Sequence, residues 1–347
     1  MRLVTFVAAD GQPRAGIMIG TGIIDIATAA PLVFEHVEGY RWDMLSLLQG
    51  NQQGATLDDL VEIQSAVISQ LGNDLSFDSI LPDNGNQDQG LTGSISIGGS
   101  EMLVPLEHVR LLAPLPYPTS LRLFDTFEQH ALLSRQLQGQ TLPAIWYAVP
   151  GFAFGNHAAV YGPEALITCL ASEALDYSLE LACVIGRTGR NIQIDEAATY
   201  IAGYMIANVW CARDIQAEEY PLGLGASKSR DFAISLGPCL LTPDELEIYC
   251  DDDGRLNLTM QARVNGIERS RGNAAAMYHT FAQMIVYASR NVTLYPGDVL
   301  TSGTVSTGCL RDLTQGQGPW LEPGDVVEIE ITELGLLRNQ VDIDVYW

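Results

Sequence analysis

The chain has 347 residues, of which 47% are hydrophobic and 17% charged, so it can bury a sizeable core and is not a disordered chain. Its 42 acidic and 18 basic residues leave a net charge of −24, which repels phosphate backbones and anionic lipid head groups. We therefore expect neither nucleic acid nor a membrane surface among its partners.

The start of the chain lacks the apolar segment of a secretory signal, and no apolar run reaches the roughly 18 residues that a membrane span needs. The six cysteines show no Cys-x-x-Cys spacing, which argues against both a zinc framework and a disulfide set. These features predict a cytoplasmic, reducing location.

Short β-strands separated by glycine turns are predicted at the beginning of the chain. They cover residues 3–7, 16–19 and 22–26. A helix is predicted over Leu57–Leu71, where apolar residues follow helical spacing behind an acidic first turn. The stretch near residues 73–100 is rich in Gly, Asn, Asp and Ser, which indicates a loop-rich insertion. A proline-rich boundary then predicts a small N-terminal domain over residues 1–112.

The remainder, residues 113–347, is rich in β-branched and alternating runs. Strands are predicted over residues 177–185, 204–212, 298–304 and 326–331. Helices are predicted over residues 126–137 and 274–289. The pattern does not alternate strand and helix, and the common glycine-rich nucleotide motifs are absent from the sequence. We therefore predict a mixed α+β fold that is predominantly β.

Lysine is almost absent from the chain. Of the 18 basic residues only Lys228 is a lysine. A chain that uses arginine nearly everywhere else can need an amine at that one position, although usage bias is the simpler explanation of the count alone.

Several short motifs follow one another along the chain. They are Leu175–Ala182, Tyr200–Tyr204, Ala212–Gln216, Lys228–Ser229, Leu236–Pro238, Tyr295–Asp298, Thr301–Thr304, Leu321–Asp325 and Leu334–Val341. In order and spacing they resemble the fumarylacetoacetate hydrolase family over roughly the whole length. The resemblance implies a small β-rich N-terminal domain followed by a mixed β-roll catalytic domain, and a homodimer.

The resemblance also implies a divalent metal ion held by three or four carboxylates, which stabilises an enolate. The corresponding positions here are Leu123, Ser178, Glu180 and Val209. Leucine and valine offer no oxygen, and a neutral serine is a poor magnesium ligand. We therefore expect no metal cofactor, and Mg²⁺ or Ca²⁺ only if carboxylates such as Asp125 and Asp176 replace the lost ligands.

The resemblance implies that the rest of the pocket is retained. The catalytic candidates are His130, Glu128, Lys228 and Glu180. The substrate-binding candidates are Asp125, Ser178, Gln216, Tyr220 and Thr304. His130 stands at the position of the general-base histidine, oriented by Glu128 or another carboxylate. Lys228 stands at the position of an active-site lysine, where it acts by its charge or as a Schiff-base nucleophile.

Three functions stay open at this point. The preferred one is a metal-independent enzyme of enolate chemistry, acting on a small-molecule oxo acid or 1,3-dicarbonyl. Its reaction is C–C cleavage or formation, decarboxylation, cyclisation or tautomerisation. The second is a catalytically inactive binding protein with the same fold, and the third is a metal-dependent hydrolase with rewired ligands.

Overall fold

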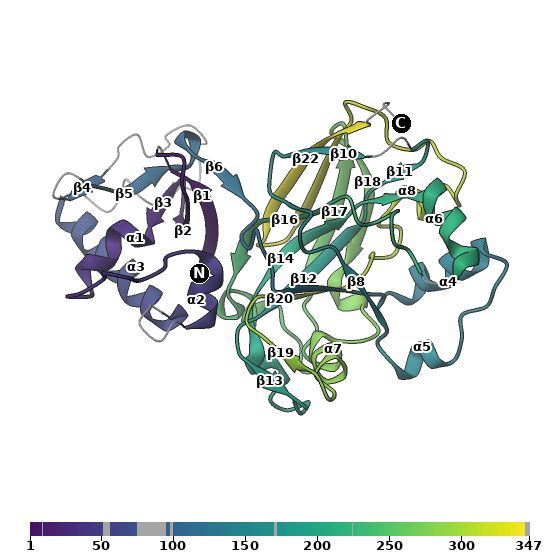
Figure 1. The fold of residues 1–347 in the computed structure, drawn as a ribbon, viewed down its shortest axis with the longest axis horizontal. Coiled ribbons are helices and arrows are strands. Elements are labelled where there is room, and N and C mark those ends of the chain that lie inside the picture. The colour runs from purple at the N-terminus through teal and green to yellow at the C-terminus, as the bar shows by residue number, and fades with distance from the viewer. Residues whose placement is uncertain are drawn as a thin grey trace.

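The computed structural model describes residues 1–8, 10–50, 56–74, 95–97, 100–169, 172–223 and 225–343. Strands dominate these residues and gather in two large sheets, with helices along their faces and edges (Figure 1). This arrangement confirms the predicted fold class, a mixed α+β fold that is predominantly β.

The first part of the chain builds one end of the molecule. Its elements are β1 (Arg2–Val7), β2 (Pro13–Ile19), β3 (Gly22–Asp25), α1 (Ile26–Ala29), η1 (Ala30–Leu32), α2 (Met44–Gln49), α3 (Leu57–Asp74), β4 (Ile95–Ile97), β5 (Ser100–Pro105), η3 (Leu106–His108) and β6 (Arg110–Leu112). The three predicted strands and the predicted helix are therefore confirmed. The predicted insertion near residues 73–100 lies mostly outside the described residues.

The second part holds the remaining strands and helices. The strands are β7 (Ser120–Phe124), β8 (Phe152–Gly155), β9 (Val160–Tyr161), β10 (Leu166–Cys169), β11 (Leu175–Asp176), β12 (Leu179–Ile185), β13 (Gly189–Arg190), β14 (Ile201–Val209), β15 (Cys211–Ala212), β16 (Ile234–Leu241), β17 (Thr259–Val264), β18 (Ile267–Asn273), β19 (Thr293–Leu294), β20 (Asp298–Thr301), β21 (Val326–Ile331) and β22 (Gly335–Ile343). The helices are α4 (Glu128–Leu137), α5 (Ile145–Ala148), α6 (Arg213–Glu219), α7 (Phe281–Ala288) and α8 (Leu310–Leu313), with short 3-10 turns η4 (Ala197–Tyr200), η5 (Tyr220–Leu222), η6 (Pro243–Tyr249) and η7 (Ala274–Ala276).

One predicted helix, residues 274–289, is divided in two. A 3-10 turn covers Ala274–Ala276, and the α-helix begins only at Phe281. The break is explained by capping, because Thr280 and Gln283 each bind the backbone N–H of the other and so satisfy donors that start a new helix.

The larger sheet joins the two parts of the chain. Among the described residues its strands follow the order β4-β5-β3-β2-β1-β16-β14-β12-β20-β7-β8. Strand β1 pairs with β16 through Arg2 and Leu241, so the sheet continues across the proposed boundary. The separation of the chain into domains at residues 112 and 113 stays a prediction.

Strand β12 lies in the middle of the molecule and is buried along its whole length. Leu179 and Leu181 face a hydrophobic core shared with the second sheet, β10-β22-β21-β17-β18. Ala182 and Val184 face a core shared with the first part of the chain. Because side chains alternate along a strand, Glu180 points to the second of these faces. The fold therefore places one carboxylate in the centre of the protein.

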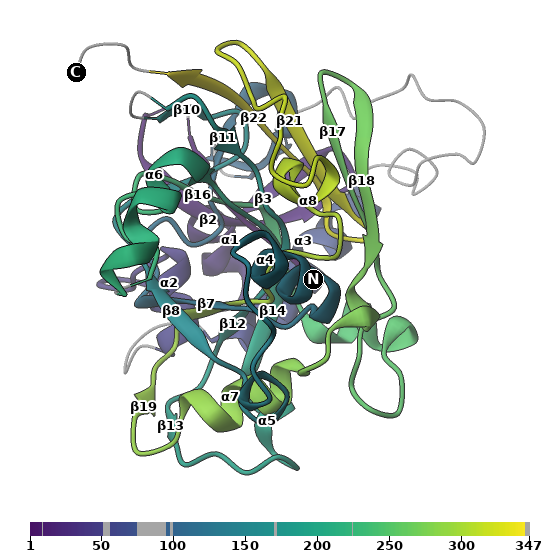
Figure 2. The ribbon, with the colours of Figure 1, turned by 90° about the vertical axis from the view of Figure 1, so that its right-hand side faces the viewer.

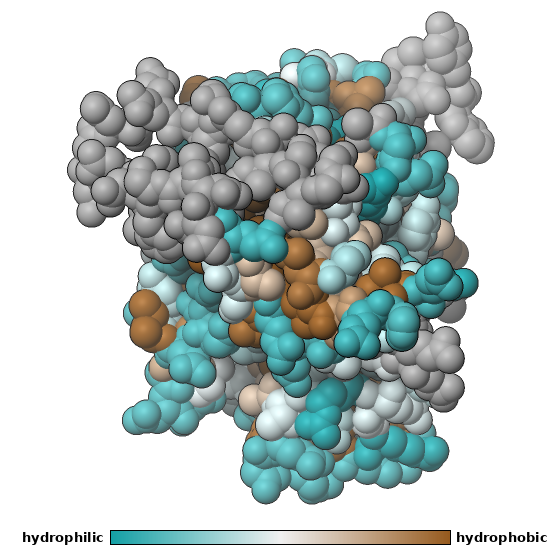
Figure 3. Space-filling model, turned by 90° about the vertical axis from the view of Figure 1, so that its left-hand side faces the viewer, coloured by the Kyte–Doolittle hydropathy of each residue, from teal (hydrophilic) through white to brown (hydrophobic). Residues whose placement is uncertain are grey.

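Helices α4, α6 and α8 gather at one face of the molecule (Figure 2). The opposite face, built largely by the first part of the chain, is mostly hydrophilic with scattered hydrophobic side chains (Figure 3). No helix among the described residues has both the length and the apolar character needed to cross a membrane.

Candidate functional site

Glu180 is the centre of a buried hydrogen-bond network. Its Oε1 accepts a hydrogen bond from Ser178 Oγ at 2.7 Å, and its Oε2 accepts one from the backbone N–H of Gly303 at 3.2 Å. Ser178 Oγ also lies 2.5 Å from Thr304 Oγ1, and Ser178 N donates to Asn208 Oδ1 at 2.8 Å. The structure thus brings together three predicted site residues, Ser178, Glu180 and Thr304.

The surroundings of Glu180 change the pKa of its carboxyl group. Burial raises the pKa of Glu180 above its usual value, and hydrogen bonds together with the charges of Arg230 and His130 oppose the rise without cancelling it. The Nε of Arg230 is buried and has no hydrogen-bond partner among the described residues. A carboxyl group with a raised pKa beside two basic side chains is suited to proton transfer.

A glycine allows the loop after β20 to approach Glu180. Gly303 has a φ of +80°, a conformation that favours glycine. A Cβ at this position would lie 2.6 Å from the backbone oxygen of Phe124 and 3.0 Å from Cα of Asp125. Asp125 is therefore next to the loop that binds Glu180, and its Oδ1 is buried without a described hydrogen-bond partner.

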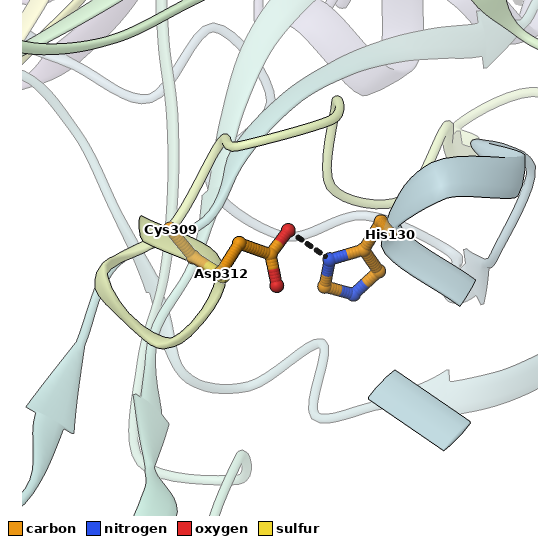
Figure 4. Close-up of side chains that lie close together, drawn as sticks. All are labelled: His130, Cys309 and Asp312. Atoms are coloured by element: carbon orange, nitrogen blue, oxygen red, sulfur yellow. Dashed lines mark hydrogen bonds and ion pairs between the residues drawn. The ribbon is translucent and has the colours of Figure 1, made fainter. Parts of the chain in front are cut away.

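His130 lies in the first turn of α4 and points toward α8 (Figure 4). Its Nδ1 is 2.7 Å from Oδ2 of Asp312, and both side chains are buried. When Nδ1 donates its proton to Asp312, Nε2 keeps a free lone pair and can accept a proton. None of the described residues forms a hydrogen bond with Nε2. The geometry therefore suits His130 to act as a base.

Asp312 keeps its negative charge in this buried pair. Burial alone raises the pKa of Asp312, but the charge and hydrogen bond of His130 and the charge of Arg311 outweigh burial and hold that pKa below its usual value. Cys309 completes the group shown in Figure 4. Burial holds the pKa of the Cys309 thiol well above its usual value, so this sulfur stays protonated at neutral pH.

The carboxylate that orients His130 is not Glu128. Glu128 Oε1 accepts a hydrogen bond from the hydroxyl of Tyr147 at 2.5 Å, on the exposed side of α4. Residues two apart on a helix point in different directions, so Glu128 and His130 do not share a face. The sequence left open whether Glu128 or another carboxylate orients His130, and the carboxylate that contacts it is Asp312, from a helix distant in the chain.

Lys228 also departs from its expected place. Its side chain is 57% exposed and its Nζ lies 3.1 Å from Oδ1 of Asp231. The carboxylate of Glu219 accepts hydrogen bonds from the backbone N–H groups of Lys228 and Ser229, which holds this turn in place. In this arrangement the amine ends at the solvent, whereas the charge of Arg230 lowers the pKa of Glu180.

Gln216 and Tyr220 meet around a second arginine. Arg311 Nη1 donates to Gln216 Oε1 at 3.4 Å and to the hydroxyl of Tyr220 at 3.3 Å. Arg213 Nη1 donates to the same Gln216 oxygen at 3.0 Å. All four residues line a cavity of about 770 Å³. Two predicted substrate-binding residues therefore face a cavity large enough for a small organic molecule.

The donors at the family's metal positions do not fit Mg²⁺ or Ca²⁺. Leu123 and Val209 are buried in one hydrophobic core. The Ser178 hydroxyl and both Glu180 oxygens are already engaged in hydrogen bonds. Hard divalent cations need several oxygen ligands, whereas these positions offer a single carboxylate and a hydroxyl.

Neither of the other acids restores that ligand set. Asp176 is engaged with the backbone N–H groups of Leu310 and Arg311, at 2.7 and 3.2 Å, and with Arg213 Nε at 2.8 Å. Asp125 adds only one more carboxylate.

The structure does bring three possible ligand types together elsewhere. Within the part of the chain that the structure describes, the group of three is His130, Cys309 and Asp312, whose ligand atoms lie within 4.8 Å of one another. His130 and Asp312 already bind each other, and the Cys309 thiol stays protonated. A metal ion there would have to displace both protons.

Three residues of the site were not predicted from the sequence, namely Arg230, Arg311 and Asp312. The last two are neighbours in the chain, a few residues after Thr304. Two adjacent charges in an otherwise uncharged segment were the one available signal.

Comparison with known proteins identifies the family. The profile described as fumarylacetoacetate (FAA) hydrolase C-terminal matches residues 123–342. Oxaloacetate tautomerase fahd2, mitochondrial, of Xenopus laevis is 30% identical over 251 residues, which are 72% of this chain and 74% of that protein. The 2,4-didehydro-3-deoxy-L-rhamnonate hydrolase of a Sphingomonas strain is 37% identical over 166 residues, 48% of this chain and 55% of that enzyme.

The fold agrees with a solved structure. Maleylpyruvate hydrolase of Sphingobium sp. SYK-6, solved with a manganese ion and pyruvate, superposes with a TM-score of 0.65 and 22% identity and covers 99% of both chains. The named relatives are enzymes that act on small molecules. The motifs, the fold and the 220-residue profile match together show that this chain belongs to the fumarylacetoacetate hydrolase family.

Proposed function

We propose that this protein catalyses proton transfer at the carbon beside the carbonyl group of a small oxo acid, without a divalent metal ion. The observation that carries the proposal is the buried pair of His130 and Asp312, 2.7 Å apart. A histidine fixed by a buried carboxylate is a general base with a defined tautomer and direction.

In the proposed reaction Nε2 of His130 removes a proton from the carbon next to the carbonyl. The electron pair of that C–H bond forms a C=C double bond, and the π pair of the carbonyl group moves to its oxygen, which gives an enolate. Return of the proton to that oxygen gives the enol, and the reverse sequence converts enol to ketone. Asp312 stabilises the imidazolium that exists between the two proton transfers.

The developing negative charge needs a cation in place of the metal ion. We assign this role to Arg230, whose charge acts on the buried Glu180 and whose Nε has no described hydrogen-bond partner. A guanidinium placed in a water-poor site stabilises an oxyanion strongly. Glu180 and Thr304, joined through Ser178, then hydrogen-bond the polar end of the substrate, with Asp125 at the adjacent loop.

The relatives and the cavity support the proposed substrate class. One relative is named as an oxaloacetate tautomerase and another as a hydrolase of a sugar-derived oxo acid. Oxaloacetate is therefore the first substrate to test, and tautomerisation is the simplest reaction that the proposed residues complete without another reactant.

The test follows the ketonisation of enol-oxaloacetate by ultraviolet absorbance, using protein dialysed against EDTA. We expect catalysis that Mg²⁺ and Mn²⁺ do not increase, and at least about a hundredfold lower turnover in His130→Asn. Activity that appears only after a divalent ion is added would support a rewired metal site instead. Tight binding of oxo acids without turnover of any of them would support the inactive binding protein. The loss of the ligand oxygens at Leu123 and Val209 favours that alternative.

A further inference from the structure

The cavity between α4, α6 and α8 contains a buried arginine without a carboxylate partner. Arg311 is 8% exposed. Its Nη2 donates to Ser134 Oγ at 2.9 Å, its Nη1 reaches the side chains of Gln216 and Tyr220, and its Nε has no described partner. Every hydrogen-bond acceptor around this guanidinium is therefore an uncharged side chain.

The other buried arginines of the described residues are different. Arg122 pairs with Asp298 at 3.3 Å, and Arg213 pairs with Asp176 at 2.8 Å. In both pairs the partner is itself buried. A buried charge is costly unless an opposite charge compensates it, which is why buried arginines are normally paired.

The acids near Arg311 are already engaged. Asp312, its neighbour in the chain, binds His130. Asp214 is the one acidic residue among those that line the cavity. It accepts hydrogen bonds from Ser172 Oγ at 2.6 Å, from Glu173 N at 2.8 Å and from its neighbour's backbone N–H. Neither acid therefore contributes an ion pair to Arg311.

Neutral hydrogen-bond donors surround the guanidinium. The hydroxyl of Tyr220 has a proton to donate, and the Oε1 of Gln216 accepts from two arginines, which leaves its amide group free to donate. Leu137 and Trp320 add apolar surface to the same cavity. This combination is suited to a carboxylate carried on a short carbon chain.

The cavity also adjoins the catalytic pair. Arg311 precedes Asp312 in α8, and Ser134 lies one helical turn after His130 in α4. Two residues that line the cavity, Ser134 and Arg311, are thus close in the chain to His130 and Asp312. We propose that Arg311 binds a second carboxylate of the substrate, so that the enzyme selects dicarboxylic oxo acids over monocarboxylic ones. That the bound acid is a substrate rests on the proposed function. That Arg311 binds a carboxylate does not depend on it.

The test measures binding of unreactive acids by isothermal titration calorimetry. The probes are succinate, glutarate and adipate, each compared with the monocarboxylate of equal chain length. We expect at least one dicarboxylate to bind at least tenfold more tightly than its monocarboxylate to the wild-type protein. In Arg311→Met this preference falls to less than twofold.

The matched control is Arg135→Met, which removes an exposed positive charge from α4, the helix that carries Ser134. It should keep the full preference. If Arg311→Met does not fold, as judged by circular dichroism, Arg311→Lys replaces it and should lower the preference at least threefold, because lysine lacks the planar fork. No preference in the wild-type protein, or an unchanged preference in the folded variant, overturns the inference.

The outcome is separable from that of the proposed function. If dicarboxylates bind in a way that depends on Arg311 but no oxo acid is turned over, the carboxylate site is supported and the proposed function is contradicted. If oxo acids are turned over but dicarboxylates are not preferred, the proposed function is supported and the carboxylate site at Arg311 is contradicted.

Discussion

Nδ1 of His130 in α4 lies 2.7 Å from Oδ2 of Asp312 in α8, although 182 positions separate the two residues in the chain. Both helices are short and sit at the same face of the molecule (Figure 2). The contact fixes the orientation of a possible base, and it is formed by tertiary packing alone.

This contact predicts which carboxylate matters for turnover. Asp312→Asn should lower kcat at least about a hundredfold, because the amide no longer stabilises the imidazolium or fixes the reactive tautomer. Glu128→Gln should change kcat less than about threefold, since Glu128 binds Tyr147 instead. Steady-state kinetics on oxaloacetate measure both. The reverse ranking of the two variants would restore Glu128 as the orienting residue.

Variants of Arg230 and Lys228 test which of the two side chains stabilises the enolate. Arg230→Met should reduce turnover at least about a hundredfold, the usual scale for a lost oxyanion-stabilising group. Lys228→Met should retain most of the activity, because its amine is solvent-exposed and paired with Asp231. Borohydride reduction in the presence of oxaloacetate checks the remaining alternative. Covalent labelling of Lys228 there would show a Schiff base and contradict the assignment to Arg230.

Glu180 should make the stability of the protein fall as the pH rises. Its folded-state pKa is raised above the ordinary 4.5, so between 4.5 and the raised value the folded protein holds more protons than the unfolded chain. The free energy of unfolding therefore decreases with pH in that window, by about 1.4 kcal/mol for each unit by which the pKa is raised.

Glu180→Gln isolates this contribution. The neutral amide can still accept from Gly303 and hydrogen-bond Ser178, but it does not titrate. The difference in unfolding free energy between variant and wild type should grow in favour of the variant from pH 4.5 upward. Urea unfolding at several pH values measures it, and parallel pH profiles for the two proteins would show that Glu180 ionises without cost.

The buried ion pair of Arg213 and Asp176 should be essential for stability. Asp176 also accepts hydrogen bonds from the backbone N–H groups at the start of α8. Arg213→Met leaves that charge buried without its partner and should cost about 3–5 kcal/mol of unfolding free energy. Arg271→Met is the matched control, because Arg271 pairs with Glu268 at the surface and should leave the urea midpoint unchanged. Equal midpoints for the two variants would contradict this ranking.

A homodimer remains our prediction, now with a candidate surface. Strand β8 is an edge strand of the larger sheet, and Phe154 on it is 71% exposed. Exposed edge strands with large apolar side chains pair readily with another chain. Light scattering at micromolar concentration should give twice the mass of one chain. In Phe154→Asp the measured mass should fall toward that of a single chain. A single-chain mass for the wild-type protein would refute the prediction.

The sequence by itself determined the family and showed which side chains occupy the family's metal-ligand positions. The ordered motifs and the alternation of apolar residues predicted the predominantly β fold, including strands such as β1 and β12, because local periodicity survives in any packing. The chemistry of Leu123, Ser178 and Val209 at ligand positions was also readable, since leucine and valine have no oxygen and a neutral serine hydroxyl is a poor Mg²⁺ ligand in any fold.

Only the tertiary structure decided which charged groups face one another. Asp312 reaches His130 because α4 and α8 pack together, and no local spacing encodes a contact across 182 residues. The turn held by Glu219 sends Lys228 to the solvent, while Arg230, two positions later, acts on Glu180. The unpaired charge of Arg311 is likewise a property of its surroundings, because burial and the engagement of nearby carboxylates exist only in the folded chain.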